Sequence, residues 1–280
     1  MNGWPVWHPA SAGRSPFYAA PGYPFFSYCL YVPHRLPKGR VPLIVAMHGS
    51  DRRPEVIRTL HAPLCDRAGA VVLVPLFPIG AVAPDDEPGY KLCAFRGVRY
   101  DLAVLAMVAD AATRVPLATD RFIMTGFSGG AQFVQRFLLL HPGRLDTVSI
   151  GAPGYISLLD DSLPWWAGTG GFAATFGHPP DIGAMRGVAI QLVIGTKDTT
   201  LDHIEVPQGD TRLMAAVERS GRTRFERMRT LEANLRAAGC DPQFDWVPGA
   251  GHAVRETFPA VETFLEARLA AISPAQPVPS

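Results

Sequence analysis

Residues 121–134 read RFIMTGFSGGAQFV, and this stretch decides the fold. Its first half is an apolar run that favours a β-strand, and its second half begins a pattern typical of an amphipathic helix. Between them stands GFSGG, residues 126–130, which is a G-x-S-x-G motif. In the context of strand, tight turn and helix, this motif places its serine on a strained turn with no room for bulk two positions away on either side. We therefore predict that Ser128 is a nucleophile presented at the end of a strand.

Short apolar runs recur along the chain and are separated by stretches with helical periodicity. Most runs are apolar at consecutive positions, as expected of strands covered on both faces. This alternation predicts an α/β fold with a mostly parallel central sheet and helices on both faces, with an antiparallel edge near residues 26–32. The expected strands are residues 43–47, 71–74, 122–124, 147–150, 190–194 and 244–247, and the expected helices are residues 100–114, 130–141, 211–238 and 254–271.

Two segments fit the alternation poorly. Residues 151–186 are rich in glycine, proline and aromatic residues, and residues 199–210 are also irregular. Long irregular connections inside a compact domain are usually functional loops, so we expect the first segment to be a small lid. We assign residues 1–272 to a single domain and residues 273–280, which hold three prolines, to a flexible tail.

A serine hydroxyl needs an adjacent base, and a histidine base needs a carboxylate that holds it in one tautomer. His252 follows the last expected strand in the loop PGAGH, and Asp198 follows the strand at residues 190–194. Both positions lie at the carboxyl ends of strands, as Ser128 does. Asp202 and Glu205 compete for the role of the acid, and the plain alternatives are an exposed loop histidine and an ordinary turn aspartate.

An oxyanion hole requires two N–H donors near the nucleophile. The residue after the nucleophile, Gly129, supplies one donor in this kind of turn. The second comes from the loop after an early strand, which here is HGS at residues 48–50. We assign it to Ser50, with Asp51 as the other choice.

These four motifs, in the order HGS, GFSGG, Asp198 and His252, resemble the α/β-hydrolase superfamily over about residues 42–269. The HGS and GFSGG spacing is similar to esterases of the polyhydroxybutyrate-depolymerase and feruloyl-esterase-like branch. The resemblance implies a serine hydrolase that cleaves a carboxylic ester or thioester through a Ser-His-Asp triad and an acyl-enzyme, with no cofactor and no metal. The HGGG motif of lipase-type esterases is absent from this sequence.

Three other functions fit parts of the pattern. A serine peptidase resembling the prolyl-oligopeptidase group also often continues its elbow with a second glycine, as at Gly130. A non-catalytic binding protein with the α/β-hydrolase fold would keep the pocket without the chemistry. A glycine-rich turn before a helix can also bind a phosphate, although no P-loop or dinucleotide-binding pattern is present at this turn.

The substrate pocket is less well defined by the sequence. Phe127 adjoins the nucleophile, and Trp165 and Trp166 lie in the segment 151–186. They would either cover an apolar acyl pocket or form the core of the lid. Arg52 and Arg53 follow the oxyanion loop, where they would either meet a substrate carboxylate or keep the surface soluble.

Composition excludes several classes of partner. The formal net charge is +1, and no run of basic residues is dense enough to indicate nucleic-acid binding. No apolar run is long enough for a membrane span, and residues 1–14 do not resemble a secretory signal, so we expect a cytoplasmic protein. The four cysteines are widely spaced without a CxxC pair, which argues against zinc and favours buried free thiols. We expect a small-molecule ester as the partner and a monomer or homodimer.

Overall fold

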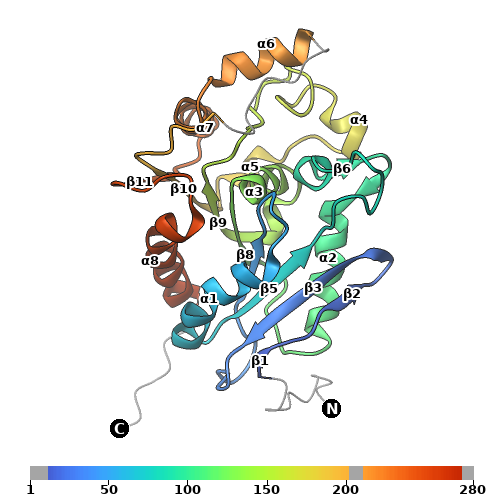
Figure 1. The fold of residues 1–280 in the computed structure, drawn as a ribbon, viewed down its shortest axis with the longest axis vertical. Coiled ribbons are helices and arrows are strands. Elements are labelled where there is room, and N and C mark those ends of the chain that lie inside the picture. Colours follow the sequence, from blue (N-terminus) through green and yellow to red (C-terminus); the bar gives the residue numbers. More distant parts are fainter. Residues whose placement is uncertain (1–11, 202–210, 273–280) are drawn as a thin grey trace.

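The computed structural model describes residues 12–201 and 211–272. Their main feature is a nine-stranded sheet in the order β1-β3-β5-β4-β8-β9-β10-β11, with β2 paired to β3 (Figure 1). A separate two-stranded sheet is formed by β6 and β7. In chain order the strands are β1 (Gly13–Arg14), β2 (Tyr18–Ala20), β3 (Tyr23–Val32), β4 (Leu43–Met47), β5 (Val71–Leu76), β6 (Ala94–Phe95), β7 (Val98–Arg99), β8 (Phe122–Phe127), β9 (Leu145–Gly151), β10 (Ala189–Gly195) and β11 (Gln243–Val247).

The six strands from β5 to β11 in the sheet order pair in parallel, whereas β3 pairs antiparallel to β5 at one side. Every residue of β4 is buried, as its continuous apolar run predicts for a strand covered on both faces. The predicted α/β class, the mostly parallel sheet and the antiparallel edge strand are therefore confirmed. Parallel pairing brings the carboxyl ends of β4, β8, β10 and β11 to one edge of the sheet.

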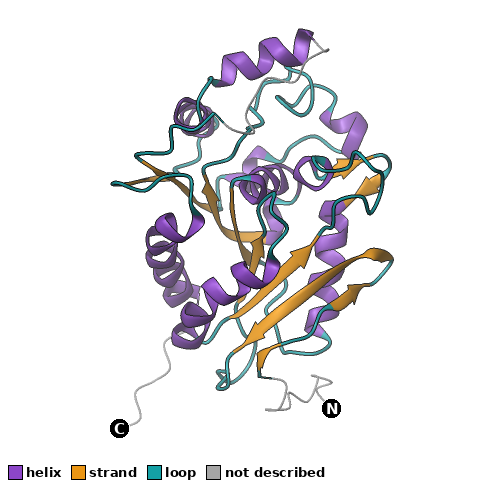
Figure 2. Ribbon diagram, viewed as in Figure 1, coloured by secondary structure: helices purple, strands orange, loops and turns teal. Residues whose placement is uncertain are grey.

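Helices cover both faces of this sheet (Figure 2). Apolar side chains of α1 and α8 pack on one face, and those of α2, α3 and α7 pack on the other. Figure 1 shows α1 and α8 together on the left and α2 on the right. The helices are α1 (Pro54–Ala68), α2 (Tyr100–Ala112), α3 (Gly129–Leu140), α4 (Phe172–Phe176), α5 (Ile182–Met185), α6 (Thr211–Ser220), α7 (Arg224–Ala237) and α8 (Val254–Ile272).

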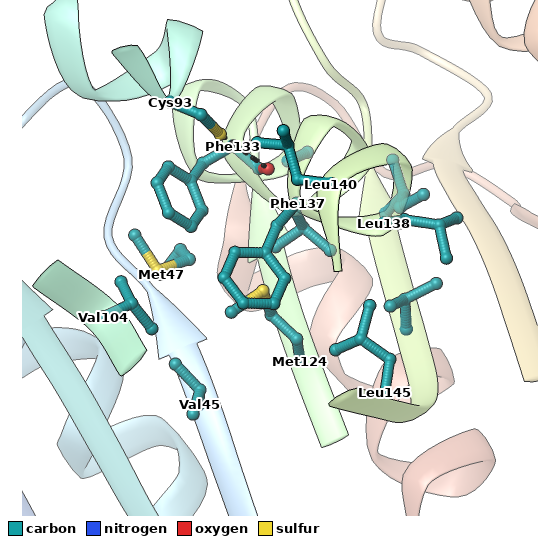
Figure 3. Close-up of a cluster of buried hydrophobic side chains, with 14 of the residues drawn as sticks. Val45, Met47, Cys93, Val104, Met124, Phe133, Phe137, Leu138, Leu140 and Leu145 are labelled. Carbon is teal, nitrogen blue, oxygen red and sulfur yellow. Dashed lines mark hydrogen bonds between the residues drawn. The ribbon is translucent and has the colours of Figure 1, made fainter. Parts of the chain in front are cut away.

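Helix α3, which follows the Ser128 turn, is fixed by the core. All of its residues are buried, and Phe133 and Phe137 project toward Met47 of β4 and Met124 of β8 (Figure 3). Burying a large apolar side chain contributes about 1.5–3 kcal/mol each to folding. The core therefore holds the helix that begins at Gly129 in a fixed position above the sheet edge.

The predicted single helix over residues 211–238 is wrong, because the chain forms two helices there. Gly221 breaks the run with a φ of +117°, which disfavours residues other than glycine. Thr223 then begins α7 with a capping box, in which Thr223 and Glu226 exchange hydrogen bonds between side chain and main chain. The motif T-x-x-E was present in the sequence and marks this helix start.

The segment 151–186 is irregular, as predicted, apart from the short helices α4 and α5. All four cysteines are buried free thiols, which confirms that expectation. Within residues 12–201 and 211–272, no helix is long and apolar enough to cross a membrane. The predicted tail at 273–280 lies outside the described residues.

Candidate active site

Ser128 occupies a strained turn between β8 and α3. Its φ of 54° and ψ of −116° are unusual for a residue with a side chain. The neighbouring glycines allow this turn, because a Cβ on Gly126 would lie 2.5 Å from the main chain of Gly130, and one on Gly130 would lie 2.8 Å from the carbonyl oxygens of Met47 and His48. The Ser128 N–H donates to Gly151 O at 2.8 Å and ties the turn to β9. The local sequence thus forces the serine hydroxyl outward at the sheet edge.

Two adjacent loops hold the histidine and the aspartate in register. The loop after β10 donates from Lys197 N to Ala250 O at 2.8 Å, and the loop after β11 donates from Gly249 N to Thr196 Oγ1 at 2.9 Å. Gly195 permits the approach, since a Cβ there would lie 2.3 Å from Ala250 O. These contacts fix the separation between residues 198 and 252.

The structure brings the three predicted side chains into one hydrogen-bonded chain. His252 Nδ1 donates to Asp198 Oδ2 at 2.6 Å, and Ser128 Oγ donates to His252 Nε2 at 3.0 Å. A carboxylate only accepts, so Nδ1 carries the proton and Nε2 presents its lone pair to the serine. The Asp198 side chain is fully buried, whereas that of His252 is 22% exposed. The alternative acids Asp202 and Glu205 lie outside the described residues.

Ser50 and Gly129 lie next to each other beside Ser128. A Cβ on Gly129 would lie 3.1 Å from Ser50 N and 2.6 Å from the hydroxyl of Tyr90, so a larger residue would have to displace the Tyr90 side chain. Within the described part of the chain, the N–H groups of Ser50 and Gly129 donate to no acceptor. Gly129 is also the first residue of α3, where the helix dipole favours negative charge. Ser50 and Gly129 thus remain the candidate donors to an oxyanion.

His48 has a positioning role that the sequence analysis missed. It is fully buried, its Nδ1 donates to Gly49 O at 2.8 Å, and its Nε2 accepts from Phe77 N at 3.1 Å. Burial lowers the pKa of His48 to about 3, so the ring is neutral at ordinary pH. It anchors the loop at residues 48–50 to the end of β5. In the sequence, this role was indicated by the position of His48 directly after the apolar run at residues 43–47.

A cavity of about 650 Å³ opens beside Ser128 and His252. Phe127 lines it, as predicted, and its ring centroid lies 4.8 Å from that of His252. The remaining apolar wall comes from α1 and the start of α8. From the segment 151–186, Gly154 contributes to the described lining. The apolar lining residues are Val56, Ile57, Phe127, Ala253 and Val254.

The two predicted pocket tryptophans are not among the described residues that line this cavity. The Trp165 ring packs edge-on against Phe172 and Phe176, with centroids 5.3 and 5.0 Å away. Trp166 packs against Tyr155 at 5.0 Å. The structure therefore favours the other reading of these residues, as the core of the segment 151–186.

Arg52 and Arg53 have separate positions. Arg53 lines the cavity, whereas the Arg52 guanidinium lies 4.1 Å from the Tyr90 ring centroid and donates to Glu87 O at 2.7 Å. Arg224, which the sequence analysis missed, lines the cavity from the start of α7. Its side chain is 3% exposed, donates to Thr200 O at 2.8 Å and lies 3.5 Å from Asp198 Oδ1. Arg224 thus provides a positive charge on the far side of the acid from His252.

No group of three or more His, Cys, Asp or Glu residues within residues 12–201 and 211–272 is arranged to hold a metal ion. Two other described histidines have partners of their own. His61 is buried on α1 against Phe258, and His141 Nε2 bonds to Asp101 at 2.7 Å.

Solved structures resemble this chain along most of its length. Poly(aspartic acid) hydrolase-1 from Sphingomonas sp. KT-1 is 17% identical with a TM-score of 0.72, and the match covers 90% of this chain and 98% of that one. The poly(3-hydroxybutyrate) depolymerase of Bordetella parapertussis is 20% identical with a TM-score of 0.71 and 94% coverage of both chains. This chain has the α/β-hydrolase fold. A ferulic acid esterase is 13% identical with a TM-score of 0.58, over 94% of this chain and all of that one. By sequence, no protein-family model and no curated protein matches.

Proposed function

We propose that this α/β-hydrolase-fold protein is a serine hydrolase that cleaves a carboxylic ester or thioester through an acyl-enzyme. The observation that carries the proposal is the hydrogen-bonded chain from Ser128 Oγ through His252 to Asp198, at the end of a cavity. A base within hydrogen-bond reach of a hydroxyl and oriented by a third group is the arrangement that activates serine. The names of the similar structures, which include a depolymerase and esterases, support ester hydrolysis in general.

The geometry supports the following cycle. Ser128 Oγ attacks the acyl carbonyl carbon while its proton passes to His252 Nε2. The N–H groups of Ser50 and Gly129 donate to the oxyanion, and Asp198 stabilises the imidazolium that forms. His252 then gives the proton to the departing alcohol or thiol. Water repeats these steps on the acyl-enzyme and releases the acid.

An ester panel tests the proposal. Purified protein should hydrolyse para-nitrophenyl acyl esters or the matching acyl thioesters, and Ser128→Ala should lower kcat by about a million-fold, because the triad acts as a unit. Thermal unfolding of both proteins is the control for folding. Turnover by Ser128→Ala at the parent rate would contradict the proposal.

Adding aminoacyl amides to the panel distinguishes the two alternatives. A serine peptidase would hydrolyse the aminoacyl amides as well as esters, an esterase would leave the amides intact, and a binding protein would turn over none of the substrates. The hydrogen-bonded chain from Ser128 through His252 to Asp198 favours a catalyst over a binding protein, because ligand recognition alone does not require a base oriented toward a hydroxyl.

A further inference from the structure

The cavity beside Ser128 has a one-sided charge. Among the described residues, its lining includes four cationic side chains, from Arg53, Lys91, Arg224 and Arg255, and one acidic side chain, from Asp51. The whole chain has a formal net charge of only +1, so this excess is local. A cavity lined by one sign of charge concentrates ligands of the opposite sign.

Two of the four cations are already paired. Lys91 Nζ lies 2.6 Å from Glu87 Oε1, and Arg224 lies 3.5 Å from Asp198 Oδ1. Arg53 and Arg255 are exposed and form no ion pair with any described residue. These two arginines are therefore the groups of the lining that remain available to an incoming anion.

Both arginines lie at helix starts, where a positively charged side chain is unfavourable. Arg53 is the residue before α1, and Arg255 is the second residue of α8. The N-terminal ends of helices disfavour positive side chains, because the helix dipole is itself positive there. Glu55 and Glu256 in the first turns offset this in part, but Glu256 already accepts from Gly251 N at 2.7 Å. Two helix starts and two arginines thus add positive potential at one cavity.

We propose that the substrate carries a carboxylate in addition to the scissile ester, and that Arg53 and Arg255 bind it. The guanidinium group matches a carboxylate in shape and in hydrogen-bonding geometry. This inference rests on the proposed hydrolase function and names the substrate class for the same site. The apolar wall of Val56, Ile57 and Val254 would accommodate the carbon chain between the two groups.

A matched pair of inactivators tests the inference without requiring the natural substrate. Both are para-nitrophenyl alkylphosphonate diesters whose phosphonate group is uncharged, and they differ only in a chain that ends in a carboxylate or in its methyl ester. Ser128 Oγ forms a bond to phosphorus, para-nitrophenolate leaves, and the serine proton passes to His252. The carboxylate compound should react at least about tenfold faster, with a ratio that falls as ionic strength rises.

Two double variants test whether Arg53 and Arg255 cause the difference between the two inactivation rates. Arg53→Gln/Arg255→Gln should reduce the ratio to near one, while Arg14→Gln/Arg35→Gln, which removes the same charge from exposed sites outside the cavity lining, should leave it unchanged. Equal rates in the parent protein, or a ratio that the cavity variant leaves intact, would overturn the inference and leave the hydrolase proposal standing. Failure of both compounds to modify Ser128 in folded protein would overturn both proposals.

Discussion

The carboxyl edge of the sheet around Ser128 and the segment 151–186 lie close together but are built differently. At the edge, main-chain approaches too tight for any Cβ hold the Ser128 turn and the loops that carry Asp198 and His252. In the segment, side chains pack on one another, with Trp165 against both Phe172 and Phe176, which also contact each other. The segment also has tight main-chain approaches, because a Cβ on Gly168 would lie 2.5 Å from Asp160 O and one on Gly170 would lie 2.6 Å from Leu163 O. The two regions therefore differ in the aromatic packing that the segment adds to such approaches.

Hydrogen bonds from α3 attach the segment to the rest of the fold, in addition to the apolar side chains that the segment contributes to the main core. Gln135 of α3 donates to Ser157 O at 2.6 Å and accepts from Ser157 N at 2.9 Å. The fully buried Arg136 donates to Ser157 Oγ at 2.9 Å, and burial lowers its pKa to about 10. Helix α3 thus begins at the Ser128 turn and holds the segment 151–186 a turn or two later. One helix therefore positions Ser128 at its start and supports the segment 151–186 further along.

The largest difference between the two regions should appear in turnover. Asp198→Asn should lower kcat by up to about ten-thousand-fold while the fold is kept, because the imidazole loses its correct tautomer. Steady-state kinetics and circular dichroism measure the two effects. A crippling Asp202→Asn together with a mild Asp198→Asn would show that Asp198 is not the acid.

The edge should also be intolerant of one added carbon. Gly126→Ala should lower the free energy of unfolding by about 3 kcal/mol and impair turnover, because its Cβ would lie 2.5 Å from main-chain atoms that cannot move independently. Gly143→Ala is the matched control, since a Cβ there meets nothing within 4 Å. Urea unfolding of both variants measures the difference, and equal stabilities would refute the tight-turn interpretation.

The segment should respond in the opposite way. Trp165→Ala should lower the free energy of unfolding by about 2 kcal/mol, as expected for a half-buried aromatic, and keep the ranking among acyl chain lengths. This outcome follows from the second of the two roles that the sequence left open for the tryptophans, the first being a pocket wall. A changed chain-length ranking with unchanged stability would restore that first reading.

The smallest expected effect, taken per histidine and per pH unit, is a dependence of stability on pH. Burial lowers the pKa of His48 to about 3 and that of His61 to about 4, below the ordinary value of 6.5. The unfolded chain then binds more protons, so stability is full above pH 6.5 and falls as pH decreases through the window down to about 3. Each histidine contributes a slope of at most about 1.4 kcal/mol per pH unit. Urea unfolding at several pH values should show a shallower slope for His61→Leu than for the parent, and equal slopes would contradict this.

Much of the edge was predictable from the sequence because strands end where their apolar runs end. Ser128, Asp198 and His252 each follow such a run, and parallel strands bring those ends together. His48 and Arg224 were missed as partners because their roles depend on contacts with Phe77 and Asp198 that no local pattern encodes.

For the segment 151–186, the sequence showed only a composition rich in glycine, proline and aromatic residues, without a pattern that predicts how the segment folds. Aromatic residues in an irregular stretch are compatible both with a pocket wall and with a small core, and the choice depends on how the loop folds back on itself. The break between α6 and α7 is a different case, because Gly221 and the Thr223 capping box carried a local signal.

The nucleophilic role of Ser128 can be tested most directly by labelling with a fluorophosphonate and locating the adduct by peptide mass spectrometry. We predict a single phosphonyl group on Ser128, formed slowly in His252→Ala and absent from Ser128→Ala. An unlabelled folded protein, or an adduct on another residue, would contradict the proposed catalytic serine.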